Sequence, residues 1–202
     1  MIELIIIRHG ETIENANNIC QGQGPGQLSE LGIRQVKQLA EKLQHETFDF
    51  VYSSDLQRTI DTTAEILRFH PEMKMITTPL LRERSLKAWE GKPFPENWSW
   101  DYLPEGAETN EDMMDRAQAF IELVLAKHDG KRVAAITHGG FIRALWTVVA
   151  QKPASEYFTW KGAQNTSVSR VMLHSEGSHE IVEMNNTDHL SVATPGTNQS
   201  FS

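Results

Sequence analysis

Two histidines in this sequence end short apolar runs and stand directly before glycine. His9 follows the run in "LIIIRHG", and His138 follows the run in "VAAITHGG". A short apolar run bounded by glycine is typical of a strand buried on both faces of a sheet. If both runs are parallel strands of one sheet, the two imidazoles lie at the edge where ligands bind in open α/β sheets. The glycines would let the backbone approach a ligand closely.

Two arginines are expected at the same edge. Arg8 precedes His9, and Arg58 lies one helical turn beyond the apolar segment 49–54. Guanidinium groups offer a planar fork of donors that matches phosphate oxygens, and the N–H groups of a helix start at Gly139 favour an anion. Either histidine alone would be an ordinary loop residue with a local hydrogen bond. Together with the arginines, they predict a site for a phosphoryl group.

A metal ion is the main alternative for two neighbouring histidines. Two histidines make a poor metal site, neither lies in a His-x-x-x-His or Glu-x-x-His pattern, and adjacent arginines repel a divalent cation. Cys20 is the only cysteine, so no internal disulfide can form and a cysteine-based metal site is not expected. We therefore expect no metal and no cofactor.

Strand and helix patterns alternate along the chain. Strands are predicted at 2–8, 49–54, 75–79 and 132–137, followed by a hairpin over 169–186 that turns at Glu176 and Gly177. Helices are predicted at 29–44, 55–69, 109–128 and 141–150. Ser29 is the expected N-cap of the first helix, and Ile60, Ala64 and Leu67 are expected to face inward from the second. This order predicts an α/β fold, a three-layer sandwich with a central, mostly parallel sheet flanked by helices.

The size of the chain suits one domain. It has 202 residues, of which 39% are hydrophobic, enough to bury a sizeable core. We expect a single domain over 1–190 and a flexible tail over 191–202, which is rich in Ser, Thr and Asn. The segment 80–106, with three Trp and three Pro, reads as a long loop, and long loops in compact domains are usually functional.

The charge balance narrows the class of partner. A formal net charge of -8 disfavours nucleic acid and acidic membrane surfaces, which reward clustered Lys and Arg. No apolar run approaches the length of a membrane span, and the first residues lack a basic leader, so we expect a cytoplasmic protein. An anionic ligand would therefore need a cluster of Lys or Arg that makes the local electrostatic potential positive despite the negative net charge.

Four blocks of the sequence resemble one protein family. "LIIIRHGETIEN", "VYSSDLQRTIDTTAEIL", "LRERSLKAWEG" and "AAITHGG" look like the signature blocks of the histidine phosphatase superfamily, which includes the cofactor-dependent phosphoglycerate mutases. The blocks occur in the family's order between Ile2 and about Val149. The resemblance implies a phosphoglycerate mutase-like fold.

The resemblance also implies a role for each site residue. His9 would be the nucleophile that takes the phosphoryl group, with a backbone carbonyl fixing its tautomer. Arg8, Arg58 and His138 would surround the phosphoryl oxygens. Glu83 matches the family's proton donor, although Glu90 lies close by in the chain. Substrate contacts are expected at four further positions: Asn15, Gln21, Gly22 and Gly139. Thr12 is a candidate cap of a helical turn.

The spacing of these blocks favours a phosphatase that acts on a small phosphate ester. Relatives that are mutases carry a longer insertion, with basic residues, between the counterparts of Glu83 and His138. With less of a lid, water should reach the phosphohistidine. A mutase primed by 2,3-bisphosphoglycerate and a catalytically silent binding module remain alternatives, and a homodimer stays open because dimers occur in the superfamily. Lys87 and the tryptophans 89, 98 and 100 are candidates for substrate contact.

Overall fold

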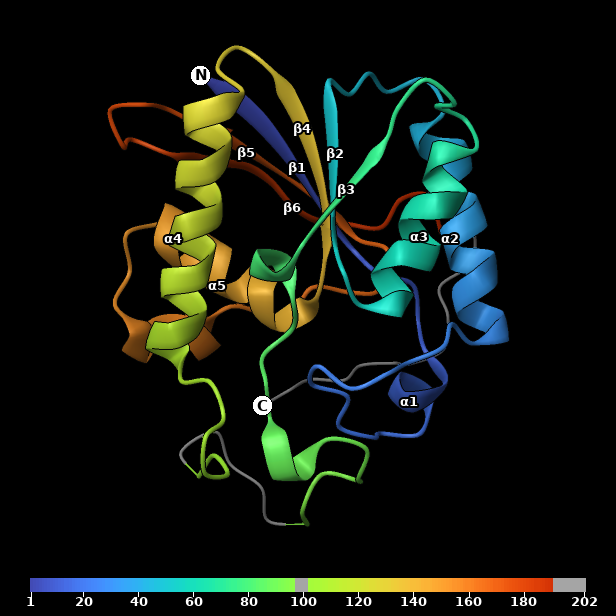
Figure 1. Ribbon diagram of the computed structural model, residues 1–202, viewed down its shortest axis with the longest axis vertical. Coiled ribbons are helices and arrows are strands. Elements are labelled where there is room, and N and C mark those ends of the chain that lie inside the picture. Colours follow the sequence, from blue (N-terminus) through green and yellow to red (C-terminus); the bar gives the residue numbers. More distant parts are fainter. Residues whose placement is uncertain (97–101, 191–202) are drawn as a thin grey trace.

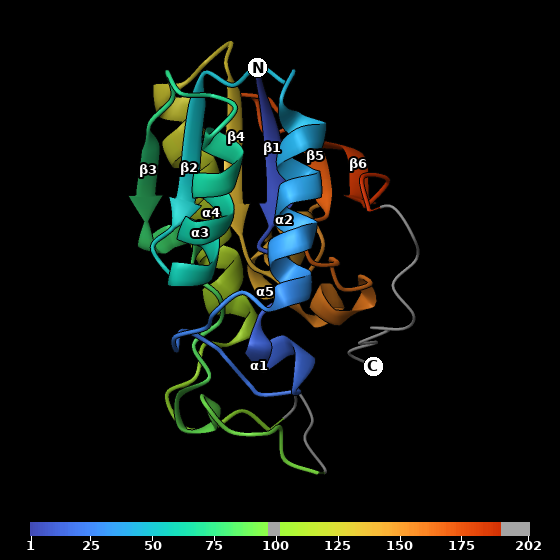
Figure 2. The same ribbon diagram turned by 90° about the vertical axis from the view of Figure 1, so that its right-hand side faces the viewer.

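The structure is a computed structural model that describes residues 1–96 and 102–190. Six strands form one sheet in the order β3-β2-β4-β1-β5-β6, and Figure 2 shows them side by side. Their bounds are β1 Ile2–Arg8, β2 Phe50–Ser54, β3 Met75–Thr78, β4 Arg132–Thr137, β5 Val168–Leu173 and β6 Glu180–Asn186. The first four run parallel to one another, whereas β5 pairs antiparallel with β1, and β6 pairs antiparallel with β5. The mixed, mostly parallel sheet confirms the predicted fold class.

Helices cover both faces of the sheet (Figure 1). Helices α2 and α3 lie on one side, and α4 and α5 lie on the other. Their bounds are α1 Ile13–Ala16, α2 Glu30–Leu43, α3 Gln57–Leu67, α4 Asn110–Lys127 and α5 Gly139–Val149. Short 3-10 helices at Pro79–Leu81, Lys87–Trp89 and Ala154–Thr159 complete the described structure. The predicted long loop over 80–106 therefore contains regular turns that the sequence pattern did not reveal.

Strand β1 carries a continuous apolar run from Leu4 to Ile7 because both of its faces are covered there. Ile2, Leu4 and Ile6 pack with α4 and α5 in one hydrophobic core. Ile5 and Ile7 pack with α2 and α3 in the other. Successive side chains of a strand point to opposite faces, so a continuous apolar run is what a central strand with two covered faces needs.

Helix α3 differs from its prediction. Leu67 is half-buried and packs against the core, as predicted. Ile60 is only half-buried and Ala64 is exposed, so the predicted inward face is wrong at Ala64. The buried face carries Arg58, Thr59, Thr62, Thr63 and Ile66. The hydroxyls of Thr62 and Thr63 donate to backbone carbonyls one turn earlier, which satisfies them inside the fold. This face is polar because it leads to the site described below.

The two predicted helix caps and the predicted hairpin turn are present in the structure. Ser29 caps α2 and accepts a hydrogen bond from the Gly32 N–H. Thr12 caps α1 in a capping box with Asn15. The hairpin between β5 and β6 turns through Gly177 at φ 86°, a conformation that glycine adopts without steric cost.

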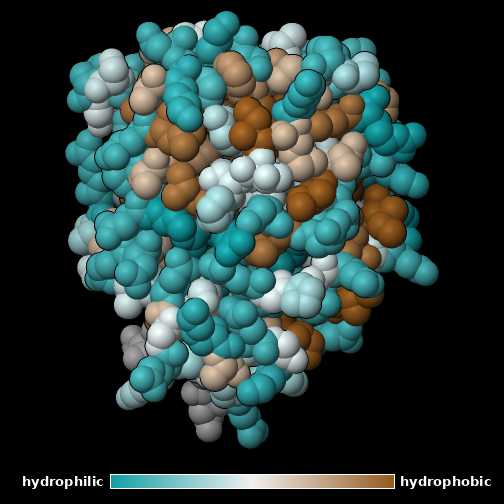
Figure 3. Space-filling view, viewed as in Figure 1, coloured by the Kyte–Doolittle hydropathy of each residue, from teal (hydrophilic) through white to brown (hydrophobic). Residues whose placement is uncertain are grey.

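The face of the molecule viewed in Figure 1 is largely hydrophilic. Figure 3 shows hydrophobic residues scattered among hydrophilic ones on this face, as is normal for a folded domain. Among residues 1–96 and 102–190, no helix is long and apolar enough to cross a bilayer. The domain bounds remain a prediction, and the predicted tail over 191–202 lies outside the described residues.

Candidate active site

Adjacent strands bring His9 and His138 together. β1 and β4 pair in parallel with Arg8 opposite Thr137, and the His9 N–H donates to the Thr137 carbonyl at 3.0 Å. The two histidines therefore lie side by side just beyond the ends of adjacent strands, and their ring centroids are 5.1 Å apart. The predicted juxtaposition of these histidines at one sheet edge is present in the structure.

His9 is held as a neutral imidazole with a defined tautomer. Its Nδ1 lies 2.7 Å from the Gly10 carbonyl, an acceptor, so Nδ1 carries the proton and Nε2 keeps its lone pair. The side chain is only 2% exposed. Burial, with the charges of Arg58 and Arg8, holds the pKa of His9 well below its usual value. The Nε2 lone pair is therefore available at neutral pH.

Arg58 joins His138 to the loop above the site. Its Nε donates to Nδ1 of His138 at 3.2 Å, and its two terminal nitrogens donate to the carbonyls of Gly24 and Gly22 at 3.1 and 2.8 Å. Burial lowers the pKa of Arg58 to about 10, which leaves the guanidinium charged at neutral pH. His138 is fully buried and also contacts Ser54 Oγ. It therefore lies behind Arg58, outside the set of residues that line the cavity.

Arg8 is fixed at the end of β1 with part of its guanidinium uncommitted. One terminal nitrogen donates to the Ala163 carbonyl at 2.6 Å, while the buried Nε has no hydrogen-bond partner among the described residues. A Cβ added to Gly139 would lie 3.5 Å from this guanidinium. Arg8 therefore lies against the first residue of α5 and presents a donor edge for an anion.

Glu83 is held at the N-terminus of α5. Its carboxylate accepts hydrogen bonds from the Gly140 N–H at 3.1 Å and from the Arg84 N–H at 2.8 Å. A carboxylate is favoured at this end of a helix. The helix start predicted to attract a phosphate thus already holds, at Gly140, an anion of the protein itself. Arg116 of α4 fixes the local backbone because it donates to the Arg82 and Glu83 carbonyls.

Glu90 has a different role from Glu83. Its carboxylate accepts from the backbone N–H groups of Gln23, Leu86 and Lys87, and Glu90 does not line the cavity. It joins the loop that follows Cys20 to the segment after Glu83. The two glutamates, which are close in the sequence, are therefore distinguished by their positions, because Glu83 lines the cavity and Glu90 does not.

The glycines at the site serve different purposes. Gly22 has φ 50°, and an added Cβ would lie 2.3 Å from Glu90 Oε1, so only glycine fits there. An added Cβ at Gly10 would lie 2.5 Å from Val36 of α2. The interpretation of Gly10 as an approach point for ligand is wrong, because its missing side chain makes room for a helix.

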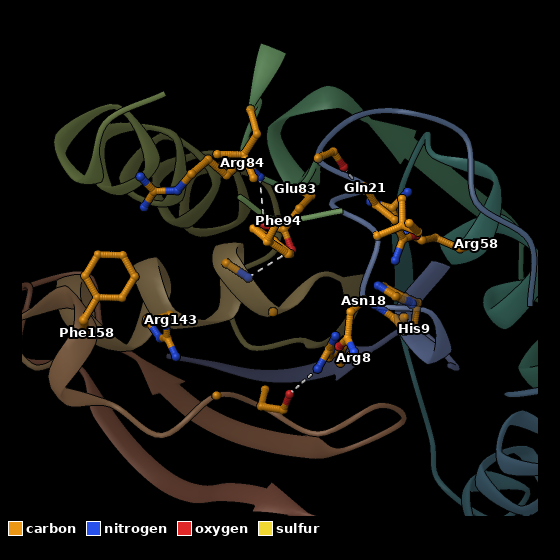
Figure 4. A pocket seen from close by; sticks show the side chains of 18 of the residues that line it. Arg8, His9, Asn18, Gln21, Arg58, Glu83, Arg84, Phe94, Arg143 and Phe158 are labelled. Carbon is orange, nitrogen blue, oxygen red and sulfur yellow. Dashed lines mark hydrogen bonds between the residues drawn. The ribbon is translucent and has the colours of Figure 1, made fainter. Parts of the chain in front are cut away.

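These residues surround one cavity of about 400 Å³, within the usual size of small-molecule sites. Figure 4 shows His9, Arg8 and Arg58 on one side of it, with Arg143 and Phe158 on the opposite side. Eight of the nine expected site residues line it, all except His138: Arg8, His9, Asn15, Gln21, Gly22, Arg58, Glu83 and Gly139.

Several further lining residues were not predicted from the sequence. They are Asn18, Arg84, Phe94, Arg143, Tyr157 and Phe158. Arg143 carried a usable signal, since it lies three residues after Gly140 on a predicted helix and residues at that spacing share a face. The segment at Tyr157 carried none. Lys87 and Trp89 do not line the cavity, and Trp98 and Trp100 lie outside the described residues.

Cationic groups dominate the cavity. Among the residues that the structure describes, four guanidiniums line it against one carboxylate, that of Glu83, so the lining charge is opposite in sign to the net charge of -8. Within residues 1–96 and 102–190, no three His, Cys, Asp or Glu side chains come close enough together to hold a metal ion. The donors present suit a multiply charged oxyanion.

Comparison with known proteins agrees with this geometry. Residues 4–187 match the histidine phosphatase superfamily, branch 1. The chain belongs to this superfamily. A histidine phosphatase relative, the metal-independent phosphoserine phosphatase of Arabidopsis thaliana, is 36% identical over 74% of this chain and 69% of its own length. A probable phosphoglycerate mutase of Yersinia pestis is 30% identical over 85% of each chain.

A solved structure extends the comparison to the fold of this superfamily member. A mycobacterial glucosyl-3-phosphoglycerate phosphatase, in complex with VO3, superposes with a TM-score of 0.83 at 26% identity. The match covers 91% of this chain and 98% of the other. The predicted phosphoglycerate mutase-like architecture is therefore confirmed over almost the whole chain.

Proposed function

We propose that this protein is a metal-independent phosphatase that hydrolyses a small phosphate monoester through a phosphohistidine on His9. One observation carries the proposal. The imidazole of His9 is buried, neutral and fixed by the Gly10 carbonyl, and it lines the same cavity as Arg8, Arg58 and Glu83. A nucleophile, two phosphoryl-binding cations and a proton carrier are the parts this reaction needs.

The first half-reaction transfers the phosphoryl group to the enzyme. Nε2 of His9 attacks phosphorus, and the bond from phosphorus to the ester oxygen breaks. Glu83 gives its proton to that oxygen, so the alcohol leaves neutral. Arg8 and Arg58 donate to the phosphoryl oxygens, where charge is concentrated in the transition state. Both guanidiniums are anchored by protein carbonyls, which keeps reorganisation small.

The second half-reaction returns the enzyme to its starting state. Water attacks phosphorus on His9, Glu83 accepts a proton from that water, and the bond from Nε2 to phosphorus breaks. Phosphate leaves with its charge still matched by the arginines. No step requires a metal, and a relative named as a metal-independent phosphoserine phosphatase supports this mechanism.

A phosphoglycerate mutase is the second candidate, because one relative is named as a probable phosphoglycerate mutase. In that case the phosphohistidine would pass its phosphoryl group to a hydroxyl of a sugar acid and not to water. Glu83 would then take the proton from that hydroxyl. The two candidates share the first half-reaction and differ only in the acceptor.

The deciding experiment measures phosphate release from a panel of monoesters with a chelator present, using wild type, His9→Ala and His45→Ala. His45 is an exposed histidine of matched chemistry. We expect release by wild type and His45→Ala and none by His9→Ala, together with an acid-labile, base-stable phosphate on His9. Mutase turnover faster than hydrolysis would favour the second candidate. A folded wild type that never forms phosphohistidine would identify a silent binding module.

A further inference from the structure

The backbone of His9 is held from both sides of β1. On one side its N–H donates to the carbonyl of Thr137, which ends β4. On the other side its carbonyl accepts from the side-chain amide of Asn165 at 3.0 Å and from the Thr166 N–H at 3.2 Å. The same Thr166 N–H lies 3.1 Å from the Arg8 carbonyl. The turn before β5 therefore fixes the backbone that carries the proposed nucleophile.

Thr166 has a strained backbone in this turn. Its φ is 59°, in a region that β-branched residues rarely adopt, and the residue is 0% exposed. The other non-glycine residues with positive φ in the described part of the chain are neither β-branched nor fully buried: Asn18, Lys87, Gln151 and Asn185. Such strain persists only where surrounding contacts enforce it, and it is concentrated at functional sites. Contacts from another segment must therefore hold Thr166 in place.

The segment that follows β6 supplies such a contact. Nε2 of His189 lies 3.1 Å from Oγ1 of Thr166. That hydroxyl gives its one proton to the Asn165 carbonyl at 2.7 Å, so it is the acceptor toward His189 and Nε2 is the donor. Burial, and then the charge of Lys42, lowers the pKa of His189 to about 4. The ring is therefore neutral at neutral pH, with its one proton on Nε2.

The register of the sheet brings these segments together. Val168, the first residue of β5, pairs with Ile7 of β1 and with Asn186 of β6, and Figure 2 shows β5 between the other two strands. The end of β1, the start of β5 and the end of β6 therefore lie at the same edge of the sheet. A second hydrogen bond joins the last two, because the Gln164 N–H donates to Oδ1 of Asn185 at 2.6 Å.

We propose that His189 is a positioning residue, which holds Thr166 and, through it, the backbone of His9 in the geometry that phosphoryl transfer needs. This inference rests on the proposed function for the role of His9. The connection runs from His189 to the Thr166 hydroxyl, and from the Thr166 N–H to the His9 carbonyl. His189 does not line the cavity. Nucleophilic attack tolerates little displacement of the attacking atom, so a looser turn should slow the reaction without loss of a substrate contact.

The test follows phosphohistidine formation by rapid quench, with saturating p-nitrophenyl phosphate. The amplitude measures the fraction of folded enzyme, whereas the rate constant measures how well His9 is placed. We expect His189→Ala to lower the rate constant about 10-fold. His189→Gln should lower it less, because its side-chain amide can also donate to Thr166. His45→Ala removes an exposed histidine and should leave the rate constant unchanged. A lower amplitude with an unchanged rate constant in His189→Ala would overturn the inference.

A second variant tests whether His189 acts through Thr166. Thr166→Gly adopts positive φ without steric cost and offers no hydroxyl to His189. We expect His189→Ala to lower the rate constant much less in the Thr166→Gly background than in wild type. An equal fold-change in the two backgrounds would overturn the inference, since His189 would then act independently of Thr166.

Amide hydrogen exchange separates failure of this inference from failure of the proposed function. The Thr166 N–H should exchange faster in His189→Ala than in wild type or His45→Ala, whether or not the protein forms phosphohistidine. If wild type forms none, the proposed function fails and exchange alone decides whether His189 holds the turn. Unchanged exchange at Thr166 would overturn the inference. If His189→Ala does not fold, Thr166→Val decides, because it keeps the branched shape, lacks the hydroxyl and should show the same two changes.

Discussion

Nε of Arg58 donates a hydrogen bond to Nδ1 of His138 at 3.2 Å. Because Nδ1 accepts, the ring proton lies on Nε2, which contacts Ser54 Oγ at 2.9 Å. Burial, and then the charge of Arg58, hold the pKa of His138 well below its usual value, which agrees with a neutral ring. Since Arg58 also donates to the carbonyls of Gly22 and Gly24, one arginine connects the second histidine to the loop over the cavity.

Replacing Arg58 with lysine should show what this connection contributes. Lysine keeps the charge but cannot reproduce the three-way fork. We expect kcat/KM to fall by about 100-fold, the cost of misplacing a phosphoryl-binding group. Amide hydrogen exchange should become faster at residues 21–26. Arg68→Lys, at an exposed position at the end of α3, is the matched control and should change neither quantity. Unaltered exchange at 21–26 would contradict the proposed connection.

The pH dependence of turnover should reflect the environment of His9. Attack needs a neutral ring, and the pKa of His9 is lowered by burial and by Arg58 and Arg8. A lowered pKa keeps the ring neutral as the pH falls, so the acid limb of kcat should lie below pH 6.5. A profile of kcat over the acidic range, rather than kcat/KM, avoids the second ionisation of the substrate near pH 6. An acid limb for His9 centred at or above 6.5 would contradict the assignment.

Substitution of Glu83 should have an effect that depends on the leaving group. Glu83→Gln keeps an acceptor for the Gly140 N–H but cannot supply a proton. We expect kcat for an alkyl ester to fall by about 100- to 10,000-fold, and kcat for p-nitrophenyl phosphate to fall far less because its leaving group needs no proton. Glu90→Gln should instead lower the melting temperature, since Glu90 accepts three backbone hydrogen bonds. The same fractional loss on both esters in Glu83→Gln would argue against a proton donor.

Two glycine substitutions separate backbone strain from steric conflict. Gly22 and Gly177 both have positive φ, but an added Cβ meets Glu90 only at Gly22 and meets nothing within 4 Å at Gly177. Gly177→Ala should cost about 1 kcal/mol of unfolding free energy and leave activity intact. Gly22→Ala should cost more and raise KM, because the loop must shift away from Glu90. Urea unfolding and steady-state kinetics give both quantities, and equal effects of the two variants would refute the steric explanation.

The sequence predicted the elements whose patterns repeat over several turns or strand residues. Strand β1 and helix α4 carry such patterns, and the His-Gly pairs marked the sheet edge. The buried face of α3 could not be predicted, because threonine hydroxyls satisfied by the helix backbone make it polar. Helix α1 is too short for a period to appear. The place of His138 behind Arg58 depends on side-chain packing between segments 80 residues apart, which no local pattern encodes.

The pairing of β1 with β4 and β5 has a consequence for how the enzyme becomes active during folding. The His9 backbone N–H donates to the Thr137 carbonyl, and the Arg8 side chain donates to the Ala163 carbonyl. The site therefore depends on contacts between the first strand and segments far along the chain. Long-range contacts of this kind form slowly because a large loop must close first. A nascent chain that has emerged only as far as β4 lacks the Arg8 anchor. The candidate site is therefore complete only late in folding, after the first strand has paired with β4 and the segment at Ala163 is in place.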